Sequence, residues 1–151
     1  MRLTVATPLG VVVDRDDVVH VRAEDETGAF GILPGHAPFL TALAISVVSW
    51  RDHAGREGHV AVRGGVLRVR RGSCLEVASR EAVAGDNLEQ LESDVLARFR
   101  AEAAVEQAAW QLTARLEVAA LRQVRRALRP DRERRPPAMT TVPAAEPGTE
   151  S

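Results

Sequence analysis

The chain changes character near residue 85, and this change limits its possible folds more than any other feature. Residues 1–84 are rich in valine and punctuated by glycine, whereas residues 86–128 contain neither glycine nor proline and are rich in Ala, Leu, Glu and Arg. Short β-branched runs between turn residues favour strands, and a long stretch of strong helix formers favours helix. The sequence therefore predicts an α+β chain, with a strand-built part over 1–84 and a helical part over 85–128.

Several short segments of the first part alternate between apolar and polar residues. In residues 60–63, two valines alternate with an alanine and an arginine, and similar patterns follow up to residue 78. A period of two places the apolar groups on one face of a strand and the arginines on the other. Short, closely spaced strands of this kind predict an antiparallel β-sandwich or barrel. At Gly64 and Gly65 we expect a bulge or a tight turn.

The second part carries helical signals. Asp86, with Glu89 three residues later, is predicted to cap the helix through a capping box. Two apolar stripes at three- and four-residue spacing follow: Leu88, Leu91, Val95 and Phe99, and then Leu112, Leu116, Ala120, Val124 and Leu128. Because the stripes are out of phase by about a quarter turn, two helices with a break within 102–107 are favoured. One unbroken helix over 86–128, about 65 Å long, is the alternative.

Composition excludes several classes of protein. The net charge of -1 and the 3% aromatic content argue against a nucleic-acid binder. All 20 basic residues are arginines, so no phosphate-binding loop with its lysine can form. The single cysteine, Cys74, rules out an internal disulfide. There is no apolar run of the roughly 20 residues that a membrane span needs, and the first residues do not resemble a signal peptide. Residues 129–151, rich in proline, are expected to form a disordered tail.

Candidate catalytic and metal-binding residues are few. The four histidines form no metal-binding spacing, although His53 and His59 flank one predicted hairpin loop. No G-x-S-x-G elbow supports a serine hydrolase. The acidic residues at 14–17 and 24–26 are interpreted as solvated turns rather than as acid–base pairs. We therefore expect no catalytic residues, no metal and no cofactor.

An arginine-rich face is predicted on the second part. On a helical wheel these residues fall within about 100° of one another, opposite the second apolar stripe. They are Arg115, Arg122, Arg125, Arg126 and Arg129. Either this is an ordinary solvated face, or it meets an acidic surface of a partner through arginine–carboxylate contacts.

The most specific stretch of the sequence is Gly28–Thr41. Two glycines bracket Phe30, and Pro34-Gly35 predicts a turn, because proline fixes φ and glycine permits a positive φ. Phe39 and Leu40 then return to the core. A rigid, solvent-facing loop on a β scaffold suits binding.

This stretch resembles the epsilon subunit of F-type ATP synthases, and the resemblance extends over residues 3–128. It is carried by Gly28–Thr41, by Val62–Val69 and by the segment Val77–Val83 that leads into Asp86. The resemblance implies an N-terminal β-sandwich of about ten strands, followed by a C-terminal α-helical hairpin. The segment Ser46–Arg51 is similar to the alternative, sometimes sodium-linked, bacterial ATPases. Whether protons or sodium ions are moved stays open.

The resemblance implies a non-catalytic subunit of the central stalk. Such a subunit turns with the rotor, links gamma to the membrane c ring, and lies peripherally on the cytoplasmic side of the bacterial inner membrane. Its helices either fold onto the sandwich or extend toward the catalytic beta subunits and block ATP hydrolysis. The contact with the c ring would be made by Phe30, Gly31, Ile32, Leu33, Pro34, Gly35 and His36. The inhibitory helix would carry Arg115, Arg122, Arg125 and Arg126.

The chain departs from the family pattern at two places, and two other functions stay open. Ala29 stands where many relatives carry an acidic residue, and no Ile/Leu-Asp-x-x-Arg-Ala motif supports regulatory ATP binding. One alternative is an unrelated β-sandwich binding module that dimerises through its helices. The other is a small metal-dependent enzyme that uses His53 and His59.

Overall fold

The computed structural model describes residues 1–128, so the predicted tail at 129–151 lies outside the described residues. The strands are β1 (Arg2–Thr7), β2 (Gly10–Arg15), β3 (Val18–Asp25), β4 (Gly28–Ile32), β5 (Phe39–Asp52), β6 (Glu57–Arg70), β7 (Cys74–Ala78) and β8 (Ala82–Gly85). The helical elements are α1 (Leu88–Gln90), a π-helical turn η1 (Leu91–Val95) and α2 (Leu96–Ala127). The chain divides into two units, Met1–Trp110 and Gln111–Ser151, and each is described by itself.

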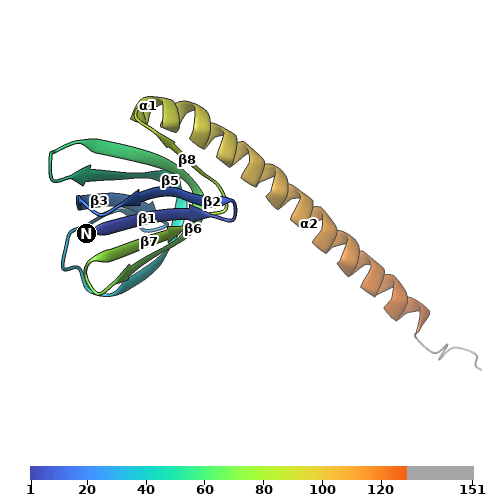
Figure 1. Cartoon of the computed structure of the whole chain (residues 1–151). Helices are drawn as coiled ribbons and strands as arrows, with labels where there is room; N and C mark the ends of the chain where they lie inside the picture. Colours follow the sequence, from blue (N-terminus) through green and yellow to red (C-terminus); the bar gives the residue numbers. More distant parts are fainter. Residues whose placement is uncertain (129–151) are drawn as a thin grey trace, which may run out of the picture. The chain divides into compact units, whose positions relative to one another are not determined.

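The eight strands form one mixed sheet that is folded into a sandwich (Figure 1). Their order is β2-β1-β7-β6-β5-β3-β4, and β8 pairs with β6. The prediction of a wholly antiparallel sheet is wrong at one place, because β1 pairs with β7 in parallel. The remaining pairs are antiparallel. The strands number eight rather than about ten, and β5 and β6, with 14 residues each, are the longest.

The long strand β6 bends between the layers at a pair of glycines. The first half of β6 pairs with β8, and its second half pairs with β7. Between the halves lie Gly64 and Gly65, whose φ angles are 67° and 126°. A Cβ atom at Gly65 would overlap with the carbonyl oxygen of Ala78. The predicted irregularity is therefore a bend inside one strand, and only glycine fits at position 65.

The core lies between the layers and is built from alternate residues of the strands. Leu3, Val5, Val21, Val48 and Leu67 are fully buried. Burial of apolar surface is the main favourable term in folding, and the inward-facing positions follow the period of two that the sequence predicts. The strand-built part thus has a closed core of its own.

The helical part begins one residue later than predicted. The N-cap is Asn87, whose side chain accepts a hydrogen bond from the backbone N–H of Gln90, and not Asp86. In η1 the N–H of Leu96 donates to the carbonyl of Leu91, five residues earlier. This wider turn brings Leu91 and Leu96 to the same side, where both are buried.

The expected break within 102–107 is absent, and the preferred two-helix interpretation is wrong. α2 runs without interruption over 32 residues, which is the single long helix of the alternative. Leu96 and Phe99 are buried against Ala61 of β6, together with Leu91. Every residue from 111 to 127 is exposed.

Candidate functional site

The stretch Gly28–Thr41 supplies an exposed turn with a buried support behind it. Ile32 is fully buried and belongs to the core, so its side chain is not available to a partner. Phe30 packs edge-on against Phe39 at 5.7 Å between ring centroids, and the His36 ring also packs edge-on against Phe39 at the same distance. These three residues are at most half-exposed. They hold the turn in place rather than forming its outer surface.

The tip of this stretch is formed by Leu33, Pro34 and Gly35, which are all exposed. Leu40 does not return to the core as predicted, because it is 66% exposed. The N–H of Gly35 donates to the carbonyl of Gly72 in the β6–β7 turn at 2.7 Å. A Cβ atom on Gly72 would lie only 3.0 Å from the Cα of Gly35, so the two turns are in direct backbone contact. The tip is therefore rigid, as the sequence predicts, and it presents one apolar side chain, Leu33.

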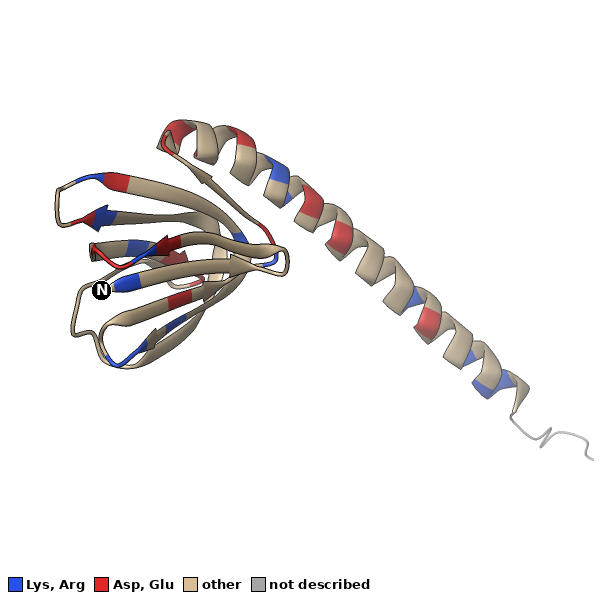
Figure 2. Cartoon of the chain, in the orientation of Figure 1, with Lys and Arg blue, Asp and Glu red and all other residues tan. Residues whose placement is uncertain are grey.

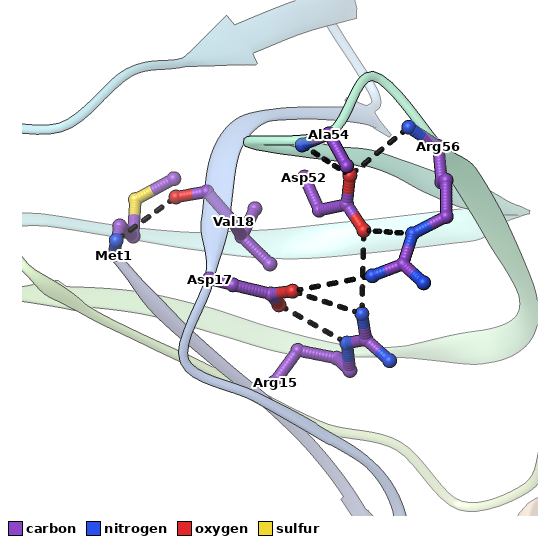
Figure 3. Close-up of polar contacts among 7 residues, drawn as sticks. All are labelled: Met1, Arg15, Asp17, Val18, Asp52, Ala54 and Arg56. Carbon is purple, nitrogen blue, oxygen red and sulfur yellow. Dashed lines mark hydrogen bonds and ion pairs between the residues drawn. The ribbon is translucent and has the colours of Figure 1, made fainter.

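A charged cluster holds two neighbouring turns together at the end of the sandwich where the N-terminus lies (Figures 1 and 3). The carboxylate of Asp52 is 2% exposed and accepts hydrogen bonds from the backbone N–H groups of Ala54 and Arg56. The Arg56 guanidinium donates to the same carboxylate at 2.7 Å, and that of Arg15 does so at 3.4 Å. Arg15 also pairs with Asp17. Two arginines and two aspartates thus fix the β2–β3 turn against the β5–β6 hairpin.

The pKa of Asp52 reflects two opposing effects. Burial disfavours the charged carboxylate, but the hydrogen bonds and the positive charge of Arg56, together with the N–H of Ala54, hold the pKa below its usual value. Asp52 is therefore a charged group with a structural role. Of the acidic residues at 14–17, which were expected to be solvated, Asp14 and Asp17 pair with arginines. The pKa of Asp14 is lowered in the same way by its hydrogen bonds from Arg2.

A second charged cluster joins β6 to the start of α2. Arg63 forms ion pairs with Glu102 at 3.1 Å and with Glu106 at 2.8 Å. Arg80 reaches Glu106, and Arg98 of α2 reaches Glu81. All of these residues lie within Met1–Trp110. The sequence pattern placed Arg63 on the face of its strand opposite the apolar groups and gave these glutamates no role, so this cluster was missed.

The arginine face predicted on the helix is present on α2. Arg115, Arg122, Arg125 and Arg126 are all exposed, while Arg129 lies outside the described residues. Figure 2 shows basic residues gathering toward the C-terminal end of α2. Exposed guanidinium groups on a helix can form bidentate contacts with carboxylates of a partner. The contact of this face with an acidic surface of a partner stays a prediction.

The residues considered for metal binding are separated. His59 is buried, and its Nδ1 lies 2.9 Å from the Ser49 hydroxyl, whereas His53 is exposed on the hairpin loop. Within residues 1–128, no three His, Cys, Asp or Glu side chains come close enough to hold a metal ion. In the same residues, no helix has both the length and the apolar character that a bilayer span requires.

Comparison with known proteins identifies the sandwich. A family model described as "ATP synthase, Delta/Epsilon chain, beta-sandwich domain" matches residues 1–85. An ATP synthase epsilon chain 2 from Paraburkholderia xenovorans is 43% identical over 133 residues, which cover 87% of this chain and 95% of the relative. A protein of the same name from Cereibacter sphaeroides is 42% identical over 104 residues, which cover 69% of this chain and 70% of that relative.

Two solved structures share the fold. One belongs to a mitochondrial ATP synthase of Euglena gracilis (OSCP/F1/c-ring), with a TM-score of 0.52 and 21% identity over 60% of this chain and 57% of that one. The other belongs to the central stalk and c-ring of the Tetrahymena thermophila mitochondrial ATP synthase, with a TM-score of 0.50 and 16% identity over 62% of this chain and 71% of that one. The matched sandwich, the similarity to bacterial relatives along most of the chain and the shared fold agree: this chain belongs to the ATP synthase delta/epsilon chain family.

Proposed function

We propose that this chain is the non-catalytic epsilon subunit of the central stalk of a bacterial F-type ATP synthase, where it links gamma to the c ring. It binds peripherally on the cytoplasmic side of the plasma membrane. The observation that carries the proposal is the 43% identity to a bacterial epsilon chain over 95% of the length of that relative. The rigid sandwich, with its exposed tip at Leu33–Gly35, suits a part that transmits torque between two partners.

The contact with the c ring is assigned to the tip of the Gly28–Thr41 stretch. Of the residues predicted for this contact, four are exposed and make it: Gly31, Leu33, Pro34 and Gly35. Phe30, Ile32 and His36 support them from behind. A photo-crosslinking side chain at Leu33 is expected to capture a c subunit in the assembled complex. The matched control is Leu9, a fully exposed leucine in the β1–β2 turn, which is not expected to capture one.

Capture of a c subunit from Leu9 but not from Leu33 would refute this assignment of the tip. Copurification tests the rotor proposal itself. The full chain is expected to form a stable complex with a gamma subunit. A self-associated dimer that binds no gamma would instead favour the β-sandwich module that dimerises through its helix.

The C-terminal half of α2 is proposed to restrain ATP hydrolysis by contacting the catalytic beta subunit. The arginine face of this half is complementary in charge to an acidic surface, and the large apolar residues of this half are exposed. Deletion of residues 111–151 is expected to raise ATP hydrolysis by the assembled complex. Replacement of Arg122, Arg125 and Arg126 by Ala is expected to give part of the same increase. Unchanged hydrolysis in both variants would refute the restraint and leave the rotor proposal standing.

A further inference from the structure

Arg63 stands on the face of β6 that the start of α2 covers. Its side chain is only 14% exposed, although arginine is rarely buried without a partner. Ala61, two residues earlier on the same face, is fully buried against Leu96 and Phe99 of α2. The guanidinium therefore lies at the edge of the apolar contact between strand and helix.

The guanidinium binds two carboxylates that are one helical turn apart. Its Nη1 lies 3.1 Å from Oε2 of Glu102, and its Nη2 lies 2.8 Å from Oε1 of Glu106. Residues four apart on a helix lie on one face, so a single forked side chain can reach both. A third carboxylate, that of Glu81, lies 3.8 Å away. The backbone N–H of Arg63 also donates to the carbonyl of Glu81.

Two outer arginines complete the network and balance its charge. Arg80 pairs with Glu106 at 3.3 Å, and Arg98 pairs with Glu81 at 2.7 Å. Three arginines thus face three glutamates. A single exposed ion pair contributes little to stability, but removing the mostly buried member of a network leaves several charges without partners.

We propose that Arg63 is a positioning residue that fixes residues 96–106 of α2 on the sandwich through Glu102 and Glu106. Leu96 and Phe99 supply an apolar contact, which is non-directional. The two ion pairs add direction, because a shift of α2 by one turn would move one glutamate out of reach. The pairs therefore set the position and rotation of residues 96–106 on the sandwich.

Hydrogen exchange on the purified full-length chain tests this role. In Arg63→Met, exchange of peptides within 96–110 is expected to be about tenfold faster, because local opening becomes easier, while peptides from β1 and β7 keep their rates. The matched control is Arg70→Met on the same strand, where Arg70 pairs with Glu76 in an exposed pair at 2.6 Å. This control is expected to leave the exchange of 96–110 unchanged.

A second variant keeps the proposal testable if Arg63→Met does not fold. Glu102→Gln combined with Glu106→Gln changes half-exposed side chains and keeps their size. It is expected to accelerate exchange of 96–110 in the same way, and added salt is expected to accelerate the wild type but not this variant. Unchanged exchange of 96–110 in the double variant would overturn the proposal.

The consequence for ATP hydrolysis rests on the proposed function and is measured separately. In the assembled complex, Arg63→Met is expected to weaken the restraint on hydrolysis, because the C-terminal half of α2 then starts from a less fixed position. Faster exchange with unchanged hydrolysis would support the positioning role and count against the restraint. The two proposals therefore fail by different observations.

Discussion

Large apolar side chains are placed in opposite ways in the sandwich and in the C-terminal half of α2. In the sandwich, Leu3, Val5 and Leu67 are fully buried between the layers. In α2, Leu112, Leu116 and Leu121 are each at least 60% exposed. The sandwich buries most of its large apolar residues in its own core, although Leu9 and Leu40 are exposed. The C-terminal half of α2 exposes its large apolar residues along 17 residues of helix, from 111 to 127.

This difference teaches which region carries stability and which is available for binding. A helix in water gains most of its stability from packing of an apolar face, and exposed apolar surface of this extent is typical of interaction sites. The C-terminal half of α2 can therefore bind a partner without disturbing the packing of the core. The start of α2, with Phe99 buried and Arg63 paired, belongs with the sandwich.

The largest effect is expected where the sandwich bends. In Gly65→Ala the new Cβ would overlap with the carbonyl of Ala78, at a φ of 126° that alanine rarely adopts. The variant is expected to lose about 4 kcal/mol or more of the free energy of unfolding, measured by urea denaturation. Gly55→Ala is the control, because Gly55 also has a positive φ but has no atom within 4 Å of the new Cβ. It is expected to lose about 1–2 kcal/mol. Equal losses would show that backbone strain alone matters at position 65.

The next effect separates the buried start of α2 from the exposed part that follows it. Phe99→Ala removes a fully buried ring and is expected to weaken the docking of the helix start by about 3 kcal/mol. Trp110→Ala removes a larger ring that is 76% exposed, and its effect on stability is expected to stay within about 0.5 kcal/mol. Denaturation followed by helical circular dichroism measures both. A large loss for Trp110→Ala would contradict the division.

A smaller effect on stability is expected when the pH is lowered, at the end of the sandwich that carries Asp52. Because the folded state lowers the pKa of Asp52, its contribution to stability is present above the unfolded pKa, near 3.8, and is lost as pH falls through the lower folded value. Asp52→Asn is therefore expected to be less stable than wild type at pH 7, and the difference is expected to shrink below about pH 3.8. Thermal unfolding from pH 7 to 2 measures this.

Asp16→Asn is the control for the acid experiment. Asp16 is exposed in the neighbouring turn, and its replacement is expected to leave the melting temperature unchanged at pH 7. If Asp52→Asn kept a constant difference from wild type down to pH 2, the loss would come from packing and not from the charge of Asp52.

Local patterns in the sequence were enough for the two regions and for the rigid tip. A period of two and the clustering of glycine predicted the sandwich, and the absence of glycine and proline predicted the helix. The Pro34-Gly35 turn followed from the backbone preferences of two residues. The parallel pairing of β1 with β7 was not predictable in this way, because it joins residues some 70 positions apart by sheet contacts alone.

The error over the helix has a local cause. Two stripes out of phase indicated two helices, but the π-helical turn at Leu91–Val95 shifts the phase of the buried residues, and the second stripe is exposed. The burial of Arg63 was missed because alternation assigns a side to each residue without showing what covers it. Glu102 and Glu106 continue the buried stripe of Phe99 along α2. Acidic residues on that stripe were the sequence signal that could have indicated a buried basic partner such as Arg63.

The smallest effect on stability is expected in the C-terminal half of α2. A change in ATP hydrolysis caused by a substitution there would distinguish this half most clearly from the sandwich. Leu116→Gln removes an exposed side chain and is expected to change the free energy of unfolding of the isolated chain by less than about 0.5 kcal/mol. The matched control on the same helix is Leu96→Gln, at a buried position, which is expected to destabilise the docked helix start. In the assembled complex, Leu116→Gln is expected to raise ATP hydrolysis, because a partner that buries this stripe loses apolar contact. If Leu116→Gln instead destabilised the isolated chain as much as Leu96→Gln does, the stripe would serve the fold of this chain and not a partner.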